Sequence, residues 1–353
     1  MNLEISKSKI KRSLRMMFGN TIQKTILRQN VILRRKMTTE LMQSGLAATH
    51  LRENLNLPSS DCHDHPTSDK RFPDGAQYRI EIPSTENVAA MKAVVEESKK
   101  YGVRVHRVSQ GTGIYLMPEP ELKDMLRIAR DNAWELCLFV TNRNAWDISA
   151  TARTDAGRNS CGGHRGADQL LFALEDIYRA CDLGLRSILV NDIGLMSVID
   201  ELKKQGKLPS NLQSKISVQM GPPNPATARL LENLGASTLN PPTDLTVPQL
   251  SSIRSAVDVP LDVYVEAPDN FGGYVRHMEV PAMVKALAPM YVKLGLRNSP
   301  DIYPSGTHIE GTCVALSRER VRRARIALDI LNRYYPEAVM SEEGPSDIGI
   351  PEI

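Results

Sequence analysis

Short runs rich in β-branched residues alternate with amphipathic helical patterns eight times between Tyr78 and Tyr334. The predicted strands cover residues 78–82, 103–108, 136–140, 187–190, 216–220, 238–240, 261–265 and 290–294. One repeat averages about 30 residues, the size of a strand–helix–strand unit. A doubly wound sheet would have fewer repeats and a glycine-rich loop after its first strand, where this chain reads IPSTENVA. The pattern therefore predicts a (β/α)8 TIM barrel over residues 77–335.

The segments outside the predicted barrel differ from it in charge. Residues 1–36 hold ten lysines and arginines and one acid, Glu4, whereas the remaining 317 residues carry 34 basic and 40 acidic side chains. We expect residues 1–76 to form a basic N-terminal extension and linker, partly disordered or peripheral, and residues 336–353 to form a C-terminal tail. The basic arm is either an upstream extension, with Met37 as the start, or a transit peptide; contact with nucleic acid or an anionic membrane is a third interpretation.

Composition narrows the class of protein. The mildly acidic body gives no reason to expect nucleic-acid binding, and no stretch approaches the roughly 18 apolar residues of a membrane-spanning helix. The five cysteines form no CxxC pair, which argues against a disulfide framework and favours a reducing compartment. We expect a cytoplasmic protein without nucleic-acid or membrane partners, and the chain could associate as a homo-oligomer.

Polar residues follow every predicted strand, and barrel enzymes place their chemistry at that end of the barrel. Some of these residues fit helix N-caps, as in Asn224-Pro225. Glu266 and Lys293 are predicted to be catalytic, because each ends an apolar strand, where a charge is either paired or reactive. Asp192 is a third catalytic candidate. The residues predicted to contact the substrate are Arg107, Asn142, Arg165, Asn191, Gln219, Arg297 and Tyr303.

Two predicted loops at the same end are unusually long, which is typical of loops that build or cover a site. Residues 141–166 carry four arginines and His164, and either bind a carboxylate or phosphate or form a solvated surface loop. Residues 296–313 contain His308 and Glu310. His308 is a fourth catalytic candidate, and the pair could bind a divalent metal ion together with Asp192, Glu266 or His277. The cofactor is otherwise unknown.

The stretch ISVQMGPPNPATARLLENLGASTLNPPTDLTVPQLSSIRSAVDVPLDVYVEA, residues 216–267, resembles the peptidase U32 family. The similar features are an amide residue closing a strand, an Asn-containing turn before a helix, LGA before the next strand, a DLT helix start and a DVYV strand. The resemblance implies a barrel hydrolase acting on a peptide or amide bond, a protease in the broad sense. Some relatives bind an iron–sulfur cluster through cysteines after strand 7, whereas this chain reads EAPDNFGG there and has no cysteine until Cys313. We therefore expect a divergent member without a cluster.

Three mechanisms remain open for a peptide or small anionic substrate. In a hydrolytic mechanism Glu266 or His308 activates water, and Lys293 or an arginine stabilises the oxyanion. In a lyase or isomerase mechanism, Lys293 abstracts a proton or forms a Schiff base and Glu266 pairs with it, with or without a metal. In the third, the barrel mouth only binds a peptide or anion.

Overall fold

The computed structural model describes residues 42–64, 66–140 and 163–353, and these form two compact units. The first unit ends at Ser60 and contains helix α2 (Leu46–Thr49) and the π-helix η1 (His50–Asn54). Within it, Arg52 donates to Gln43 Oε1 at 2.9 Å and to Ser59 Oγ at 2.8 Å. The second unit spans Asp61–Ile353 and holds the barrel.

The second unit is a closed parallel barrel in which eight strands follow one another in chain order and β8 pairs with β1, as Tyr78 opposite Met290 shows. The strands are β1 (Tyr78–Ile82), β2 (Arg107–Gln110), β3 (Glu135–Phe139), β4 (Ser187–Val190), β5 (Gln213–Ile216), β6 (Thr238–Leu239), β7 (Leu261–Glu266) and β8 (Met290–Leu294). The predicted TIM barrel is confirmed.

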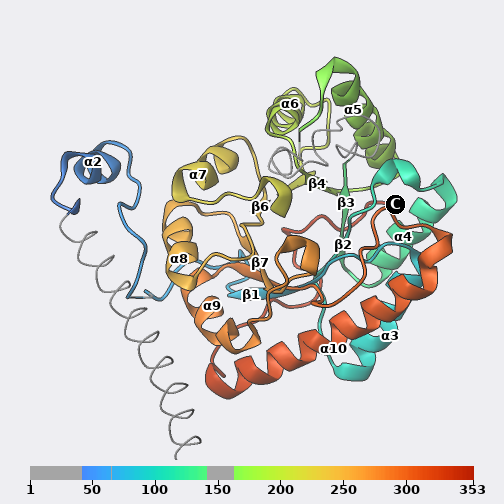
Figure 1. Cartoon of the computed structure of the whole chain (residues 1–353). Coiled ribbons are helices and arrows are strands. Elements are labelled where there is room, and N and C mark those ends of the chain that lie inside the picture. Colours follow the sequence, from blue (N-terminus) through green and yellow to red (C-terminus); the bar gives the residue numbers. More distant parts are fainter. Residues whose placement is uncertain (1–41, 65, 141–162) are drawn as a thin grey trace, which may run out of the picture. The chain divides into compact units, whose positions relative to one another are not determined.

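Helices surround the strands (Figure 1). They are α3 (Val88–Tyr101), α4 (Glu119–Asp131), α5 (Gly166–Asp182), α6 (Ile193–Lys204), α7 (Pro225–Asn233), α8 (Val247–Ala256), α9 (Val280–Leu287) and α10 (Glu310–Tyr334). Short helical turns lie between them: η2 (Ile114–Leu116), η5 (Val218–Met220), η6 (Asp269–Phe271), η7 (His277–Glu279) and η8 (Thr307–Ile309). The last helix, α10, packs along α3 (Figure 1).

Strands β1, β4 and β8 have the predicted bounds, whereas β2 and β5 do not. The second strand begins at Arg107 instead of Val103. Val103 and Val105 are buried like strand residues, but they lie in the loop before β2 and do not pair with β1. The fifth lies at Gln213–Ile216 instead of 216–220. Ser217 ends it by accepting a hydrogen bond from Gln219 N at 3.2 Å, which caps the 3-10 turn η5.

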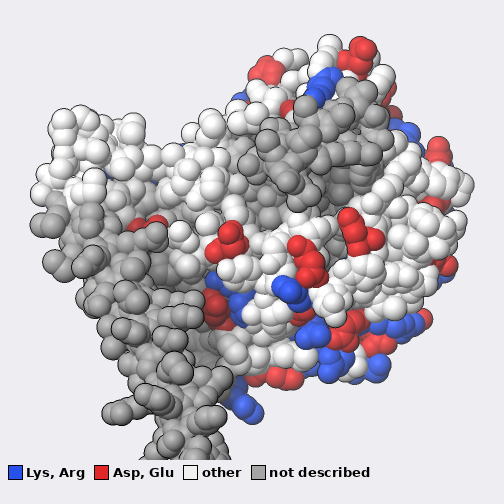
Figure 2. All heavy atoms as spheres, in the orientation of Figure 1, with Lys and Arg blue, Asp and Glu red and all other residues white. Residues whose placement is uncertain are grey.

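Charges of both signs are intermixed on the surface seen in Figure 2. Ion pairs link α10 to α3, where Arg318 lies 2.6 Å from Glu96 and 2.8 Å from Glu97. No helix in the described part of the chain has the length and apolar content needed to cross a membrane.

The chain after α10 returns to the amino-terminal ends of the strands. Gln77 N donates to Val339 O at 2.7 Å, and Arg79 reaches both carboxylate oxygens of Asp347 at 2.9 and 2.6 Å. Arg79 Nε also donates to Ser341 Oγ at 2.8 Å. This segment therefore closes the end of the barrel opposite the predicted active site.

His106 connects the same segment to the barrel. Its Nδ1 accepts a hydrogen bond from Ile80 N at 3.1 Å, and its Nε2 lies 3.0 Å from Ser341 O. A carbonyl oxygen can only accept, so the ring is neutral with its proton on Nε2. Burial lowers the pKa of His106 to about 4.

We expect this histidine to make the fold sensitive to acid. The unfolded chain takes up a proton near pH 6.5 and the folded chain only near pH 4, so stability is complete above about pH 6.5 and is lost as the pH falls towards 4. The loss should be about 2–3 kcal/mol. Urea unfolding of the wild type and of His106→Gln, each at pH 7 and about pH 4.5, measures it. Equal losses in the two proteins would contradict this assignment.

Candidate active site

Glu81 lies at the centre of the barrel and is fully buried. One carboxylate oxygen pairs with Lys215 and lies 3.3 Å from Arg107 Nη1. The other accepts from Ser109 Oγ at 2.7 Å and lies 3.4 Å from Lys293 Nζ. Burial alone would raise the pKa of Glu81, but the charges of Lys215, Lys293 and Arg107 hold it well below its ordinary value. Glu81 is therefore an ionised hub of the barrel interior.

Two further acids complete this buried network. Asp262 lies 2.8 Å from Arg107 Nη1 and 3.4 Å from Lys215 Nζ, and it accepts from Thr238 Oγ1 at 2.6 Å. Glu135 lies 2.9 Å from Arg107 Nε. The barrel interior thus pairs three carboxylates, Glu81, Glu135 and Asp262, with three cations, Arg107, Lys215 and Lys293.

The network explains the position of Arg107. We predicted this residue after the second strand, at the mouth, but it begins β2 and contacts all three buried carboxylates. Its guanidinium also lies 3.7 Å from the centre of the Tyr291 ring. Arg107 therefore holds the barrel interior together and does not line the mouth pocket.

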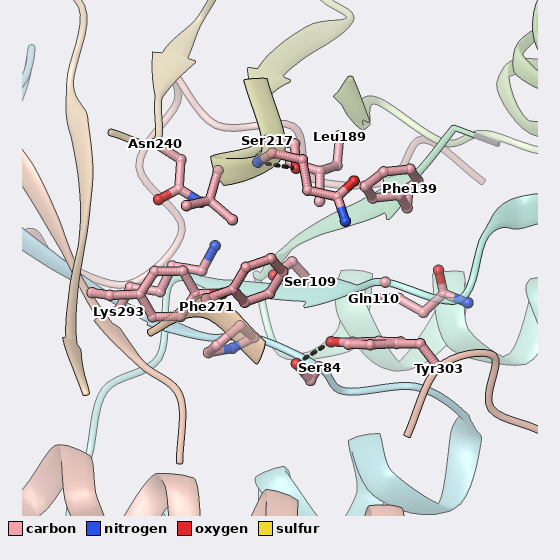
Figure 3. Close-up of a pocket in the computed structure, with 15 residues that line it drawn as sticks. Ser84, Ser109, Gln110, Phe139, Leu189, Ser217, Asn240, Phe271, Lys293 and Tyr303 are labelled. Carbon is pink, nitrogen blue, oxygen red and sulfur yellow. Dashed lines mark hydrogen bonds between the residues drawn. The ribbon is translucent and has the colours of Figure 1, made fainter. Parts of the chain in front are cut away.

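A small pocket opens above the network at the carboxyl ends of the strands (Figure 3). Hydroxyl and amide groups form part of its wall, from Ser84, Ser109, Gln110, Ser217, Gln219, Asn240, Tyr264 and Tyr303. Phe139, Leu189 and Phe271 form an apolar part. Among the described residues that line it, Lys293 alone carries a formal charge.

The amine of Lys293 is held at the floor of this pocket. Figure 3 shows it directed towards Asn240. With the Asn240 amide turned over from the orientation drawn, which satisfies both of its ends, the amide oxygen accepts from Nζ at 2.9 Å and the nitrogen donates to the Asp262 carbonyl at 2.8 Å. The amine also lies 4.3 Å from the centre of the Tyr264 ring. Glu81, Asn240 and Tyr264 therefore fix the amine from three sides while the pocket leaves it a path to a ligand.

Tyr303 forms another part of the wall. Its hydroxyl hydrogen bonds with Ser84 Oγ (Figure 3), and Ser84 has a φ of 56°, a conformation that is uncommon for a residue with a side chain. The Tyr303 ring packs on Gly111, where an added Cβ would lie 2.6 Å from Cε1 of the ring. The glycine is therefore needed for Tyr303 to approach the pocket.

Glu266 does not line this pocket. The pairing of β7 with β8 shifts register between Tyr264 and Glu266, and such a bulge redirects the side chains that follow it. Glu266 accepts from His277 Nε2 at 2.9 Å and from Arg297 N at 2.9 Å. Burial raises its pKa, and these hydrogen bonds together with Arg323 lower it below the ordinary value. Glu266 is therefore separated from Lys293, with which we predicted it would act.

Asp192 and Asn191 lie beside the pocket and not on its wall. Asp192 accepts from Leu195 N at 2.6 Å and from His164 N at 2.7 Å, so it caps α6. Burial acts to raise its pKa, but its hydrogen bonds to His164 and Leu195 hold that pKa below the ordinary value. Asn191 Nδ2 lies 3.4 Å from Gln219 Oε1. Of the predicted contact residues, Gln219 and Tyr303 line the pocket.

The other described candidates do not line the pocket that contains Lys293. Arg165 is exposed at the N-cap of α5, and Arg297 pairs with Asp269 at 2.9 Å. His308 lies in η8 and Glu310 begins α10, and both are exposed. Asn142 lies outside the described residues.

No three potential metal ligands lie together among the described residues, so His308 and Glu310 do not meet a third ligand there. The described cysteines, Cys62, Cys137, Cys181 and Cys313, are all free thiols. Cys137 lies on β3, Cys181 on α5 and Cys313 on α10. Since an iron–sulfur cluster is held by neighbouring thiolates, these cysteines do not fit one.

The sequence pattern did not point to Lys215, Asp262 and Tyr264. Lys215 directly precedes the predicted fifth strand, and Asp262 and Tyr264 lie inside the predicted seventh. All three lie within or face the barrel interior. Side chains alternate between the two faces of a strand, so Asp262 and Tyr264 share one face of β7. A charged residue two positions from another polar residue in a short apolar strand, as Asp262 is from Tyr264, would have indicated a polar barrel interior.

These features define a TIM-barrel protein with a lysine at a polar mouth. Residues 166–267, from the start of α5 to the residue after β7, match the model of peptidase family U32. The resemblance to that family is thus confirmed over this stretch. A search of curated proteins found no match.

Three solved structures are similar to this chain at low identity. A U32 peptidase is 19% identical with a TM-score of 0.37, over 58% of this chain and 74% of that chain. A 3-keto-L-gulonate-6-phosphate decarboxylase from Vibrio cholerae is 13% identical with a TM-score of 0.36, over 69% and 97%. A truncated 3-deoxy-D-arabino-heptulosonate 7-phosphate synthase from Thermotoga maritima is 13% identical with a TM-score of 0.40, over 80% and 98%. The similarity is one of fold alone.

We expect Gly111→Ala to open the wall of the pocket at Tyr303. The new methyl group must displace the Tyr303 ring and break its hydrogen bond with Ser84. Lys293 should then react faster with acetic anhydride, relative to the exposed Lys92, as measured by peptide mass spectrometry. Gly311→Ala is the control, because nothing lies within 4 Å of a Cβ at that position. Unchanged labelling of Lys293 in Gly111→Ala would show that Tyr303 does not shield it.

Proposed function

We propose that the barrel mouth is an enzyme active site in which the amine of Lys293 reacts with the carbonyl group of a small molecule, in a lyase or isomerase reaction. The observation that carries this proposal is the position of the amine. It is a potential nucleophile at the floor of a pocket in which no other described lining residue is charged. A lysine amine in such a place is suited to Schiff-base chemistry.

The reaction follows from the chemistry of amines. The ammonium group of Lys293 first loses one proton to solvent. The neutral amine then adds to the carbonyl carbon, its two remaining protons leave with the carbonyl oxygen as water, and a C=N bond remains. Once protonated, that bond draws in the electron pair of an adjacent C–C or C–H bond, which breaks. A proton added to carbon in the resulting enamine restores the C=N bond, and hydrolysis of that bond releases the product and regenerates the lysine. Asn240 and Tyr264 orient the amine for the first addition.

Hydrolysis of a peptide or amide bond is a second candidate, because the U32 family model covers residues 166–267. Such a reaction requires a base that activates water. No carboxylate or imidazole is among the described lining residues, and the carboxylate of Glu81 below them is engaged by three cations. The geometry therefore favours the lysine reaction.

We also propose that the protein works in a reducing, cytoplasmic compartment. The free thiols Cys62, Cys137, Cys181 and Cys313 support this proposal.

The test is reductive trapping. Sodium borohydride, added in the presence of a panel of small aldehydes, ketones and oxo acids, should convert the Schiff base into a stable secondary amine. Peptide mass spectrometry should locate the adduct on Lys293. Lys293→Arg should lose it, whereas Lys92→Arg, which changes an exposed lysine, should keep it.

Two outcomes would reject the lysine reaction. One is an adduct spread over exposed lysines and unaffected by Lys293→Arg. The other is hydrolysis of a peptide or amide panel that Lys293→Arg leaves at the wild-type rate, which would favour the second candidate and place its site elsewhere.

A further inference from the structure

Arg320 on α10 is a buried arginine with few partners. It is 3% exposed, and among the described residues its one hydrogen bond runs from Nη1 to the carbonyl oxygen of Ser84, at 3.0 Å. Its Nε has no hydrogen-bond partner. An arginine carries five N–H donors, and a buried charge without a counterion is costly. Most of the binding capacity of Arg320 is therefore unused in the free protein.

The other buried arginines of the described chain are more fully bound. Arg79 and Arg107 pair with carboxylates. Arg276 donates to two carbonyl oxygens and to Glu279. Arg254 has no carboxylate partner, but it donates to the carbonyl oxygens of three residues, Val257, Val259 and Pro289. Arg320 thus differs from residues of the same type and burial.

Arg320 also lines a cavity of about 110 Å³, which the more fully bound Arg254 does not. Ser84 and Tyr303 line both this cavity and the pocket that contains Lys293. The pair of hydroxyl groups that they form therefore lies between the two spaces. A ligand group bound by Arg320 would be next to the proposed reaction centre.

We propose that Arg320 binds the carboxylate of the substrate whose carbonyl group reacts with Lys293, so that the substrate is an oxo acid. The part of this proposal that concerns the carbonyl group rests on the proposed reaction at Lys293. A carboxylate accepts two parallel N–H bonds from an arginine, which would satisfy the unused donors.

The charge around the cavity favours a carboxylate over a phosphate group. Asp269 and Asp301 also line it. Asp269 is paired with Arg297, and Asp301 accepts from Tyr303 N at 3.1 Å. Near these acids, one arginine matches a single negative charge better than the double charge of a phosphate. Burial lowers the pKa of Arg320 and outweighs the opposing effects of Tyr303 and Glu86. The Glu86 carboxylate is itself engaged by the backbone N–H groups of Gly111 and Thr112.

The experiment compares the full-length wild type with Arg320→Met and Arg320→Lys. The control is Arg318→Met, which removes a half-exposed arginine from the same helix. Binding of acetate and of inorganic phosphate is measured by calorimetry. Reductive trapping at Lys293 is then measured with oxo acids whose carbonyl and carboxylate groups are one to four bonds apart, and with their neutral methyl esters.

We expect acetate to bind more tightly than phosphate, and Arg320→Met to lose that binding. We also expect the wild type to trap one oxo acid at least tenfold more efficiently than its ester. Arg320→Met should abolish this preference, Arg320→Lys should retain part of it, and Arg318→Met should leave it unchanged. Circular dichroism verifies folding, and Arg320→Lys carries the comparison if Arg320→Met does not fold.

Other outcomes separate the two proposals. Arg320-dependent acetate binding without a preference for the acid over the ester would indicate a separate anion and would overturn the oxo-acid proposal. A preference for the ester, or acetate binding that survives in Arg320→Met, would overturn the role of Arg320. If no carbonyl compound is trapped while Arg320-dependent acetate binding remains, the lysine reaction fails and the anion site stands.

Discussion

The contact of Glu81 with two lysines and an arginine is the interaction on which the barrel depends. Each of these groups is almost entirely removed from water, and an unpaired charge in such a place would cost several kcal/mol. Asp262 and Glu135 complete the balance around Arg107. Because the network is neutral as a whole, the barrel can be filled with ions where most barrels of this class pack branched apolar side chains.

The buried cations of the barrel have different roles at its two ends. Arg79, paired with Asp347, closes the amino-terminal end, where His106 binds the same C-terminal segment. Lys215 and Arg107 lie among the carboxylates. Lys293 differs from these cations because it has a carboxylate on one side and the open pocket on the other. The same ions that stabilise the fold therefore hold one amine in place for chemistry.

Much of the fold was predictable, because hydrophobic periodicity depends on local sequence: β1, β4 and β8 were placed to the residue. The candidate site was only partly predictable. Lys293, Gln219 and Tyr303 line the pocket, as predicted. The bulge in β7 turns Glu266 towards His277, and a bulge cannot be predicted from the local sequence pattern. Lys215 and Asp262 were missed because their partners are distant in sequence. Arg320 was missed because an arginine in an amphipathic helix is normally solvated.

The central claim is that Lys215 serves the fold alone, whereas Lys293 also reacts with the substrate. Free energies of unfolding, measured by urea titration for Lys215→Met and Lys293→Met, test it most directly. Removing Lys215 leaves buried carboxylates uncompensated and should cost about 3–5 kcal/mol. Removing Lys293 should cost less, about 1–3 kcal/mol, because Glu81 keeps Lys215 and Arg107 as partners, while reductive trapping is abolished. An equal loss of stability in the two variants, with trapping retained in Lys293→Met, would contradict the account.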